Sequence, residues 1–129
     1  MRMEHVALNV TDPMAVAAWY AEHLGMRIVR ASSEGVQAHF LRDDAGMMIE
    51  IYRNESAPLP DRRAMHPLEL HLAFVSADPL GDREELLAAG AELIEEIHGE
   101  DGSLVVMLRD PWGAAFQLCR RTVPLGAED

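Results

Sequence analysis

The sequence contains no lysine, so all eleven of its basic residues are arginines. Chemistry that depends on a lysine amine, as a Schiff base or as a general base, is therefore excluded. Acidic residues number 22 and bring the formal net charge to −11 at pH 7. A chain this acidic is repelled by nucleic-acid phosphates and by anionic lipid surfaces, so we expect neither as a partner.

Cysteine and long apolar runs are also scarce. The one cysteine, Cys119, excludes an internal disulfide and is typical of a reducing cytoplasm. No run approaches the roughly 18 apolar residues of a membrane helix. The first residues, "MRMEHVALNV", show no apolar stretch followed by a small-residue cleavage site, so we expect a cytoplasmic protein rather than a secreted one.

The 129 residues are enough for one compact domain or for two small modules that share a core. The hydrophobic fraction of 49% supports a buried core, whereas aromatic residues make up only 5%. The eight methionines indicate adaptable packing, as is found around cavities.

An internal repeat organises the chain. "EHVALNVTDP" returns as "LHLAFVSADP", with His5 and His71 separated by 71 − 5 = 66 residues. "FLRDDAGMMIEIYR" matches "MLRDPWGAAFQLCR" at an offset of 67, and "HLGMRIV" matches "AAGAELI" at an offset of 65. Three matches in the same order, at nearly the same offset, indicate a duplicated unit of about 65 residues. We place the repeats at about 1–53 and 68–121, with a polar, proline-containing linker at 54–67, in a single domain.

Each unit reads as a strand, a helix and three further strands. Alternation and turn signals predict strands at 5–10, 27–31, 37–42 and 47–53, and at 71–75, 92–98, 104–108 and 114–120. Asp12 and Pro13 predict the start of the first helix, which Gly25 ends. For the second helix, Asp82 is the expected cap and Gly90 the expected end. The fold class is therefore α+β, with two tandem βαβββ modules.

Polar side chains interrupt the apolar strands at equivalent positions of the two repeats. His5 and His71 begin the first strands, and Glu50 and Gln117 (117 − 50 = 67) lie on the last ones. Because alternate residues of a strand share a face, these side chains are expected on the face away from the helix. They would converge if the sheets curve around a common cavity. Each position has a plainer interpretation, since a strand histidine or glutamate is commonly an ordinary core or surface residue.

Two imidazoles, a carboxylate and an amide oxygen suit a divalent metal such as Zn²⁺, Ni²⁺, Fe²⁺ or Mn²⁺. An ionised glutamate between apolar neighbours is costly when unpaired, and a metal ion would remove that cost. The sequence therefore predicts a divalent-metal site formed by His5, Glu50, His71 and Gln117.

The same segments resemble the vicinal oxygen chelate superfamily, which includes glyoxalase I, bleomycin-resistance proteins and extradiol dioxygenases. The resemblance rests on "EHVALNVTDP", "LGMRIV", "MIEIY", "LHLAF" and "RDPWGAAFQL". It implies paired βαβββ modules that form a curved, cup-like mixed sheet, usually completed in a homodimer. It also implies metal ligands on the first and last strands, at His5, Glu50, His71 and Gln117. Metal-dependent members usually carry glutamate where this chain has Gln117.

The resemblance implies a metal-dependent lyase or isomerase of glyoxalase or epimerase type, acting on a small substrate that chelates the metal through vicinal oxygens. Glu50 is then the expected base, with His66 in the linker as a possible second one. An Fe²⁺ ring-cleaving dioxygenase that uses His5, His71 and Glu50 is one alternative. A metal-free protein that sequesters a drug, as bleomycin-resistance proteins do, is another.

Four further side chains are expected to bind the substrate, three of which, Met48, Tyr52 and Cys119, share strand faces with the predicted ligands; filling core space is the plainer interpretation of each. They are Met48, Tyr52, Met107 and Cys119. Three arginines, Arg53, Arg62 and Arg63, have the charge to bind an anionic substrate group, although solvated linker charge is the simpler interpretation. His39 is expected to have a structural role.

Overall fold

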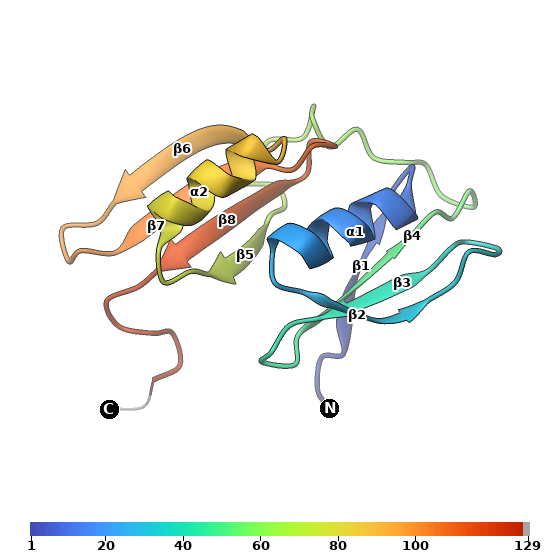
Figure 1. Cartoon of the computed structure of the whole chain (residues 1–129), viewed down its shortest axis with the longest axis horizontal. Coiled ribbons are helices and arrows are strands. Elements are labelled where there is room, and N and C mark those ends of the chain that lie inside the picture. Colours follow the sequence, from blue (N-terminus) through green and yellow to red (C-terminus); the bar gives the residue numbers. More distant parts are fainter. Residues whose placement is uncertain (128–129) are drawn as a thin grey trace. The chain divides into compact units, whose positions relative to one another are not determined.

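The computed structural model describes residues 1–127. The chain divides into two compact units, Met1–Pro60 and Asp61–Asp129, each containing one module, and they are described separately (Figure 1). The division falls within the segment 54–67. None of the helices in the described part of the chain has the length and apolarity of a membrane span.

The first module contains one helix and a four-stranded mixed sheet. Its elements are β1 (His5–Asn9), α1 (Pro13–His23), β2 (Arg27–Ala31), β3 (His39–Arg42) and β4 (Met48–Tyr52). The strands lie in the order β1-β4-β3-β2, with β1 parallel to β4 and the other neighbours antiparallel. The two ends of the module's chain, β1 and β4, are therefore neighbours in its sheet.

The second module repeats this arrangement. Its elements are β5 (Leu72–Val75), α2 (Pro79–Ala88), β6 (Glu92–His98), β7 (Leu104–Arg109) and β8 (Ala115–Arg120). The strand order β5-β8-β7-β6 matches that of the first module, and β5 is parallel to β8. The prediction of two tandem βαβββ modules in an α+β fold is confirmed. The joining of the two sheets into one cup stays a prediction.

Both helices begin at an Asp-Pro pair. Asp12 accepts a hydrogen bond from the amide of Ala15 at 3.2 Å, and Asp78 accepts one from the amide of Gly81 at 3.2 Å. The prediction that Asp82 caps the second helix was wrong, because the helix begins one turn earlier at Pro79. The carboxylate of Asp82 lies inside the first turn instead, where it accepts a hydrogen bond from the Ser76 hydroxyl at 2.5 Å.

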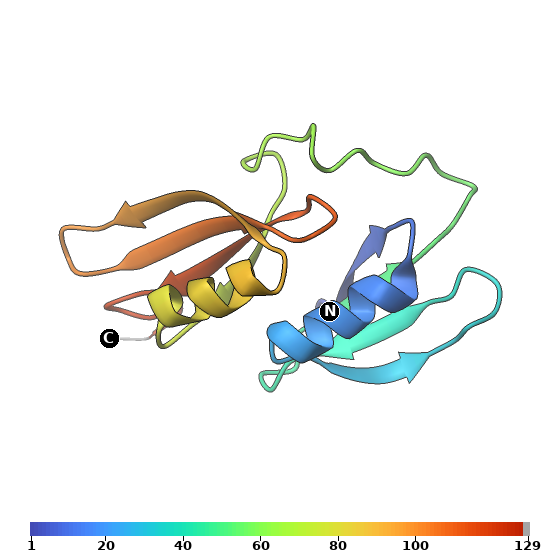
Figure 2. The ribbon, with the colours of Figure 1, turned by 45° about the horizontal axis from the view of Figure 1, so that its top comes forward.

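Each helix covers one face of its own sheet (Figures 1 and 2). Helix α1 contacts β3 and β4, whose Leu41, Ile49 and Ile51 are buried. Helix α2 contacts β7 and β8 in the same way, over Phe116 and Leu118. Burying these side chains is the main source of stability. Because strand residues alternate, Glu50 and Gln117 lie on the faces that the helices leave uncovered.

The repeat extends to the turns. Gly46 follows β3 and Gly113 follows β7, with φ values of +97° and +95°, a conformation that favours glycine. In each turn the preceding aspartate accepts a backbone hydrogen bond: Asp43 from Met47 at 2.8 Å, and Asp110 from Ala114 at 2.9 Å. Equivalent residues therefore perform equivalent structural roles, which supports the alignment used to compare the two modules.

Candidate metal centre

In the first module the structure brings two of the predicted ligands together. Glu50 lies opposite Ala7 in the parallel β1–β4 pair, and His5 precedes Ala7 by two residues on the same face. The Nε2 atom of His5 lies 3.1 Å from Oε2 of Glu50. Their side chains are 31% and 19% exposed, so the pair is half-buried yet open to a ligand.

Both ring nitrogens of His5 face carboxylates. Nδ1 lies 3.0 Å from Oε1 of Glu4, on the opposite side of the ring from Glu50. A carboxylate that accepts from the distal nitrogen orients an imidazole for metal binding through the other nitrogen. Phe40 packs against the same ring, edge to face, with centroids 5.5 Å apart and an interplanar angle of 87°. His5 is therefore held in place on two sides.

In the second module, the other two predicted ligands, His71 and Gln117, have the same strand pairing as His5 and Glu50. Gln117 lies opposite Ala73, and His71 precedes Ala73 by two residues. The Nδ1 atom of His71 donates to the carbonyl of Pro67 at 2.9 Å, because a carbonyl oxygen only accepts. The proton of neutral His71 is thus on Nδ1, which leaves the Nε2 lone pair available to a metal.

The amide oxygen of Gln117 accepts a hydrogen bond from Sγ of Cys119 at 3.5 Å. This contact orients the amide with its oxygen, the donor that a metal would require, toward the same face as Cys119. Burial raises the pKa of the Cys119 thiol, and the charge of Arg121 opposes that rise. The thiol is therefore kept protonated, able to donate to Gln117.

The donor set fits a divalent metal ion. Ligand atoms about 2.1 Å from a metal, at angles between octahedral and tetrahedral, are about 3.0–3.4 Å from each other. The 3.1 Å separation of His5 Nε2 and Glu50 Oε2 lies in this range. His71 presents the tautomer that a metal requires, and its Pro67 contact is the usual partner of a metal-binding imidazole.

No group of three or more His, Cys, Asp and Glu side chains forms a metal site among residues 1–127. Within the first module the reason is geometric. Glu4 and Glu50 approach opposite edges of the His5 ring, so these three side chains do not converge on one point. The set of four that the sequence predicts draws on both modules and stays a prediction.

The side chains predicted to bind substrate lie on the same faces as the predicted ligands. Met48 and Tyr52 are half-buried on the Glu50 face of β4, two residues to either side. Met107 lies opposite Gln117 in the β7–β8 pair and is buried, as is Cys119. Their contact with a substrate stays a prediction.

Sequence reasoning missed Phe40 at this site. Phe40 lies opposite Glu50 across the β3–β4 pair and contacts His5. The repeat could have indicated Phe40, because position 40 aligns with Met107 (107 − 40 = 67), which was predicted to bind the substrate. His39 lies beside it on the helix-covered face, 5% exposed, with its Nδ1 2.7 Å from the carbonyl of Gln37. That placement supports the structural role expected for His39.

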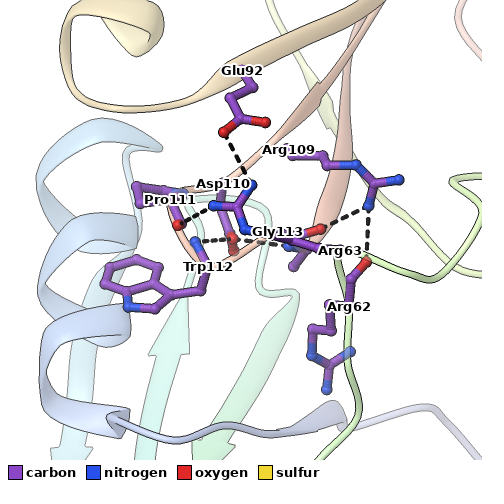
Figure 3. A network of polar contacts seen from close by, with 9 residues as sticks. Arg62, Arg63, Glu92, Arg109, Asp110, Pro111, Trp112 and Gly113 are labelled. Atoms are coloured by element: carbon purple, nitrogen blue, oxygen red, sulfur yellow. Dashed lines mark hydrogen bonds and ion pairs between the residues drawn. The ribbon is translucent and has the colours of Figure 1, made fainter.

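Two of the three arginines considered for anion binding, Arg53 and Arg63, make structural contacts. The guanidinium of Arg63 bonds to Glu92 at 3.0 Å and to the carbonyl of Pro111 at 2.7 Å (Figure 3). Arg53 forms an ion pair with Glu55 at 3.3 Å. These two guanidinium groups are therefore engaged with the protein itself. Their binding of an anionic substrate group stays a prediction.

Arg109 fastens the linker to the second module. Its Nη1 donates to the carbonyls of Arg62 and Gly113 at 2.9 and 2.8 Å (Figure 3). Its Nη2 donates to the carbonyl of Met65 at 2.9 Å. The linker ends two residues after Met65, at Pro67, whose carbonyl accepts a hydrogen bond from His71. A short stretch of backbone thus connects the contacts of Arg109 with the partner of a predicted ligand.

Comparison with known proteins agrees with this fold. The model of a glyoxalase-like domain family matches residues 5–119. No curated protein sequence matches the chain significantly. Among solved structures, a glyoxalase family protein from Bacillus cereus is 21% identical, with a TM-score of 0.78 over 92% of this chain and 93% of that one.

Two further solved structures are similar in fold. A glyoxalase-related enzyme from Fulvimarina pelagi is 21% identical, with a TM-score of 0.74 over 98% of this chain and 93% of that one. The fosfomycin resistance protein FosX from Listeria monocytogenes, solved with Mn(II) and sulfate, is 19% identical, with a TM-score of 0.73 over 95% and 91% of the two chains. The family match spans both modules, and this chain therefore belongs to the glyoxalase-like domain family of the vicinal oxygen chelate superfamily.

Proposed function

We propose that this protein is a metal-dependent lyase or isomerase of glyoxalase or epimerase type, acting on a small substrate with two adjacent oxygens. The observation that carries the proposal is the 3.1 Å contact between His5 Nε2 and Glu50 Oε2. It places an imidazole and a carboxylate side by side on an uncovered sheet face, as a metal site with a neighbouring base requires. Family membership gives independent support for metal-dependent chemistry.

His5, Glu50, His71 and Gln117 would hold the metal ion. A divalent ion bound there would act as a Lewis acid that stabilises negative charge on the substrate oxygens. The donor set suits Zn²⁺, Ni²⁺, Fe²⁺ or Mn²⁺. Mn²⁺ is a suitable first choice for loading, because FosX from Listeria monocytogenes was solved with it.

Glu50 is the residue that we assign to proton transfer. Its Oε2 faces His5, so Oε1 is the atom proposed to accept a proton from the substrate carbon. Gln117 cannot accept a proton at neutral pH and would only bind or orient. The two modules would then differ in role, with Glu50 as base and Gln117 as a neutral ligand.

His66 is less suited to act as a second base. Its Nδ1 accepts a hydrogen bond from the amide of Leu68 at 3.1 Å, so the proton of the neutral ring is on Nε2. In that tautomer the exposed nitrogen donates rather than accepts. We therefore favour a mechanism with one base.

The first test is the metal content of protein purified without added metal. We expect close to one equivalent per chain in the wild type and a large loss in H5A, E50A and H71A. His98 is an exposed strand residue, 65% exposed, so H98A is the matched histidine control and should keep its metal. Wild-type protein that neither contains metal nor binds Mn²⁺ would contradict the proposal.

The second test follows proton exchange in D₂O. Metal-loaded protein is incubated with a panel of hydroxyketones and hydroxyacids, and deuterium incorporation next to the carbonyl is measured by NMR. E50Q should abolish exchange while its fold is retained. Consumption of O₂ with catechols would instead favour a ring-cleaving dioxygenase, and tight binding of a drug without metal would favour a sequestering protein.

The assembly and location of the protein stay predictions. A homodimer is proposed because the superfamily resemblance implies one, and sedimentation velocity checks it. The single cysteine is the feature that favours the cytoplasm.

A further inference from the structure

The first module contains a cavity of about 560 Å³ beside the His5–Glu50 pair. Six of the residues that line it are Arg2, Glu4, Val29, Arg42, Gly46 and Met48. Met48 is the register partner of His5, and Glu4 accepts a hydrogen bond from it. The volume is in the range of small-molecule sites. The cavity therefore begins next to the proposed metal ligands, at the end of the sheet where β1 and β4 start.

Two arginines give this cavity positive charge in an otherwise acidic protein. Neither the Arg2 nor the Arg42 guanidinium takes part in a hydrogen bond or ion pair with another of residues 1–127. Among the described residues, Glu4 is the only carboxylate that lines the cavity, and it is paired with His5 at 3.0 Å. The two guanidinium groups thus present donors that no group of the module occupies.

The arginine at the equivalent position of the second module has hydrogen-bond partners, so an arginine at this position of the repeat need not be left without them. Arg109 occupies the same place in the repeat (109 − 42 = 67), and its guanidinium donates to three backbone carbonyls. Arg42 instead folds back over the β3–β4 turn, where a Cβ added to Gly46 would lie 3.4 Å from its Nη2. Its guanidinium therefore lies at the cavity without a hydrogen-bond partner among residues 1–127.

We propose that Arg2 and Arg42 bind an oxyanion, a carboxylate or a phosphate, on a part of the substrate separate from its two metal-chelating oxygens. Arginine presents paired donors that match the geometry of both groups. The assignment of this anion to the substrate rests on the proposed function, because the substrate would have to reach from His5 and Glu50 into the cavity. The substrate class is then a small anionic molecule with vicinal oxygens.

Anion binding is tested first on metal-free protein. Inorganic phosphate and acetate are titrated separately at low ionic strength, and the amide NMR signals of Gly46 and Met48 are followed. We expect saturable shifts, with binding weakened about tenfold or more in R42A and in R2A. Arg120 is exposed at the end of β8, so R120A is the control and should bind as the wild type does. The stronger of the two anions indicates which group the substrate carries.

The link to the substrate is tested on Mn²⁺-loaded protein. Lactate and malate share a metal-chelating hydroxyacid group, and malate has one further carboxylate. We expect malate to bind about tenfold more tightly, and R42A to remove this difference without weakening lactate. Unchanged urea unfolding of R42A ensures that the comparison is made on folded protein.

The outcomes separate the two proposals. Phosphate binding at the cavity without uptake of metal would overturn the proposed function and leave the anion site standing. Metal uptake with no saturable shift at Gly46 and Met48, or with R42A equal to the wild type, would overturn the anion site alone. A loss in R120A as large as that in R42A would also overturn it, since the effect would then be one of general charge.

Discussion

Replacing Arg109 with alanine should destabilise the second module and weaken metal binding at His71. The guanidinium of Arg109 makes three hydrogen bonds to carbonyls, at 2.8–2.9 Å, and two of these belong to the linker residues Arg62 and Met65. The linker then reaches Pro67, whose carbonyl holds Nδ1 of His71 at 2.9 Å. Loss of the arginine therefore affects both the fold and the orientation of a proposed ligand.

The expected magnitude follows from these contacts. A hydrogen bond to a charged group contributes about 1.5–3 kcal/mol when buried. Arg109 is half-buried, and the linker carbonyls that it leaves are accessible to water, so we take about 1 kcal/mol for each bond. R109A should thus lower the free energy of unfolding by about 3 kcal/mol. Loss of the hydrogen bond that orients a metal-binding histidine typically lowers metal affinity about 10–100-fold.

Urea unfolding followed by circular dichroism measures the first effect, and Mn²⁺ titration measures the second. R42A is the matched control, because Arg42 has the equivalent position but makes none of these carbonyl contacts. It should be nearly neutral in both assays. A loss of stability below about 1 kcal/mol in R109A, or equal losses in R109A and R42A, would refute the reasoning.

Two further predictions concern the fold. G113A should be more destabilising than G46A by at least about 2 kcal/mol in urea unfolding. Both glycines have positive φ, but only at 113 would a Cβ clash with the chain, 2.9 Å from the Arg63 backbone nitrogen. Equal losses of stability in G113A and G46A would show that the positive φ, and not the clash with Arg63, causes the destabilisation. For pH dependence, the hydrogen bond from Arg83 holds the pKa of Glu96 below its ordinary value. This contribution to stability is present above that ordinary pKa and is lost as the pH falls through the lowered one. E96Q should therefore flatten the stability profile as the pH falls below the ordinary glutamate pKa, and an unchanged profile would contradict the assignment.

Much of the architecture could be predicted because it depends on local patterns. The Asp-Pro pair at Asp12 starts a helix by capping and a preset φ, both of which act within a few residues. Alternation along β4 correctly separated Ile49 and Ile51, which are buried under the helix, from Glu50 on the other face. The repeat then transferred these assignments to the second module.

The features that the sequence did not predict depend on local competition or on contacts distant in the chain. Asp78 and Asp82 are both good caps, and only the observed helix start shows that Asp82 bonds to Ser76 instead. The contacts of Arg109 with residues 44 and 47 positions away have no periodic signal. Likewise, Arg42 and Arg109 are the same residue at the same repeat position, and only their surroundings distinguish them.

The central claim is that one histidine from each module binds the same metal ion. Electron spin-echo envelope modulation of Mn²⁺-loaded protein tests it directly, because the modulation from imidazole nitrogen reports how many histidines coordinate. We expect two in the wild type and in H98A, and one in each of H5A and H71A. Two histidines remaining in H5A or in H71A, or none in the wild type, would contradict the account.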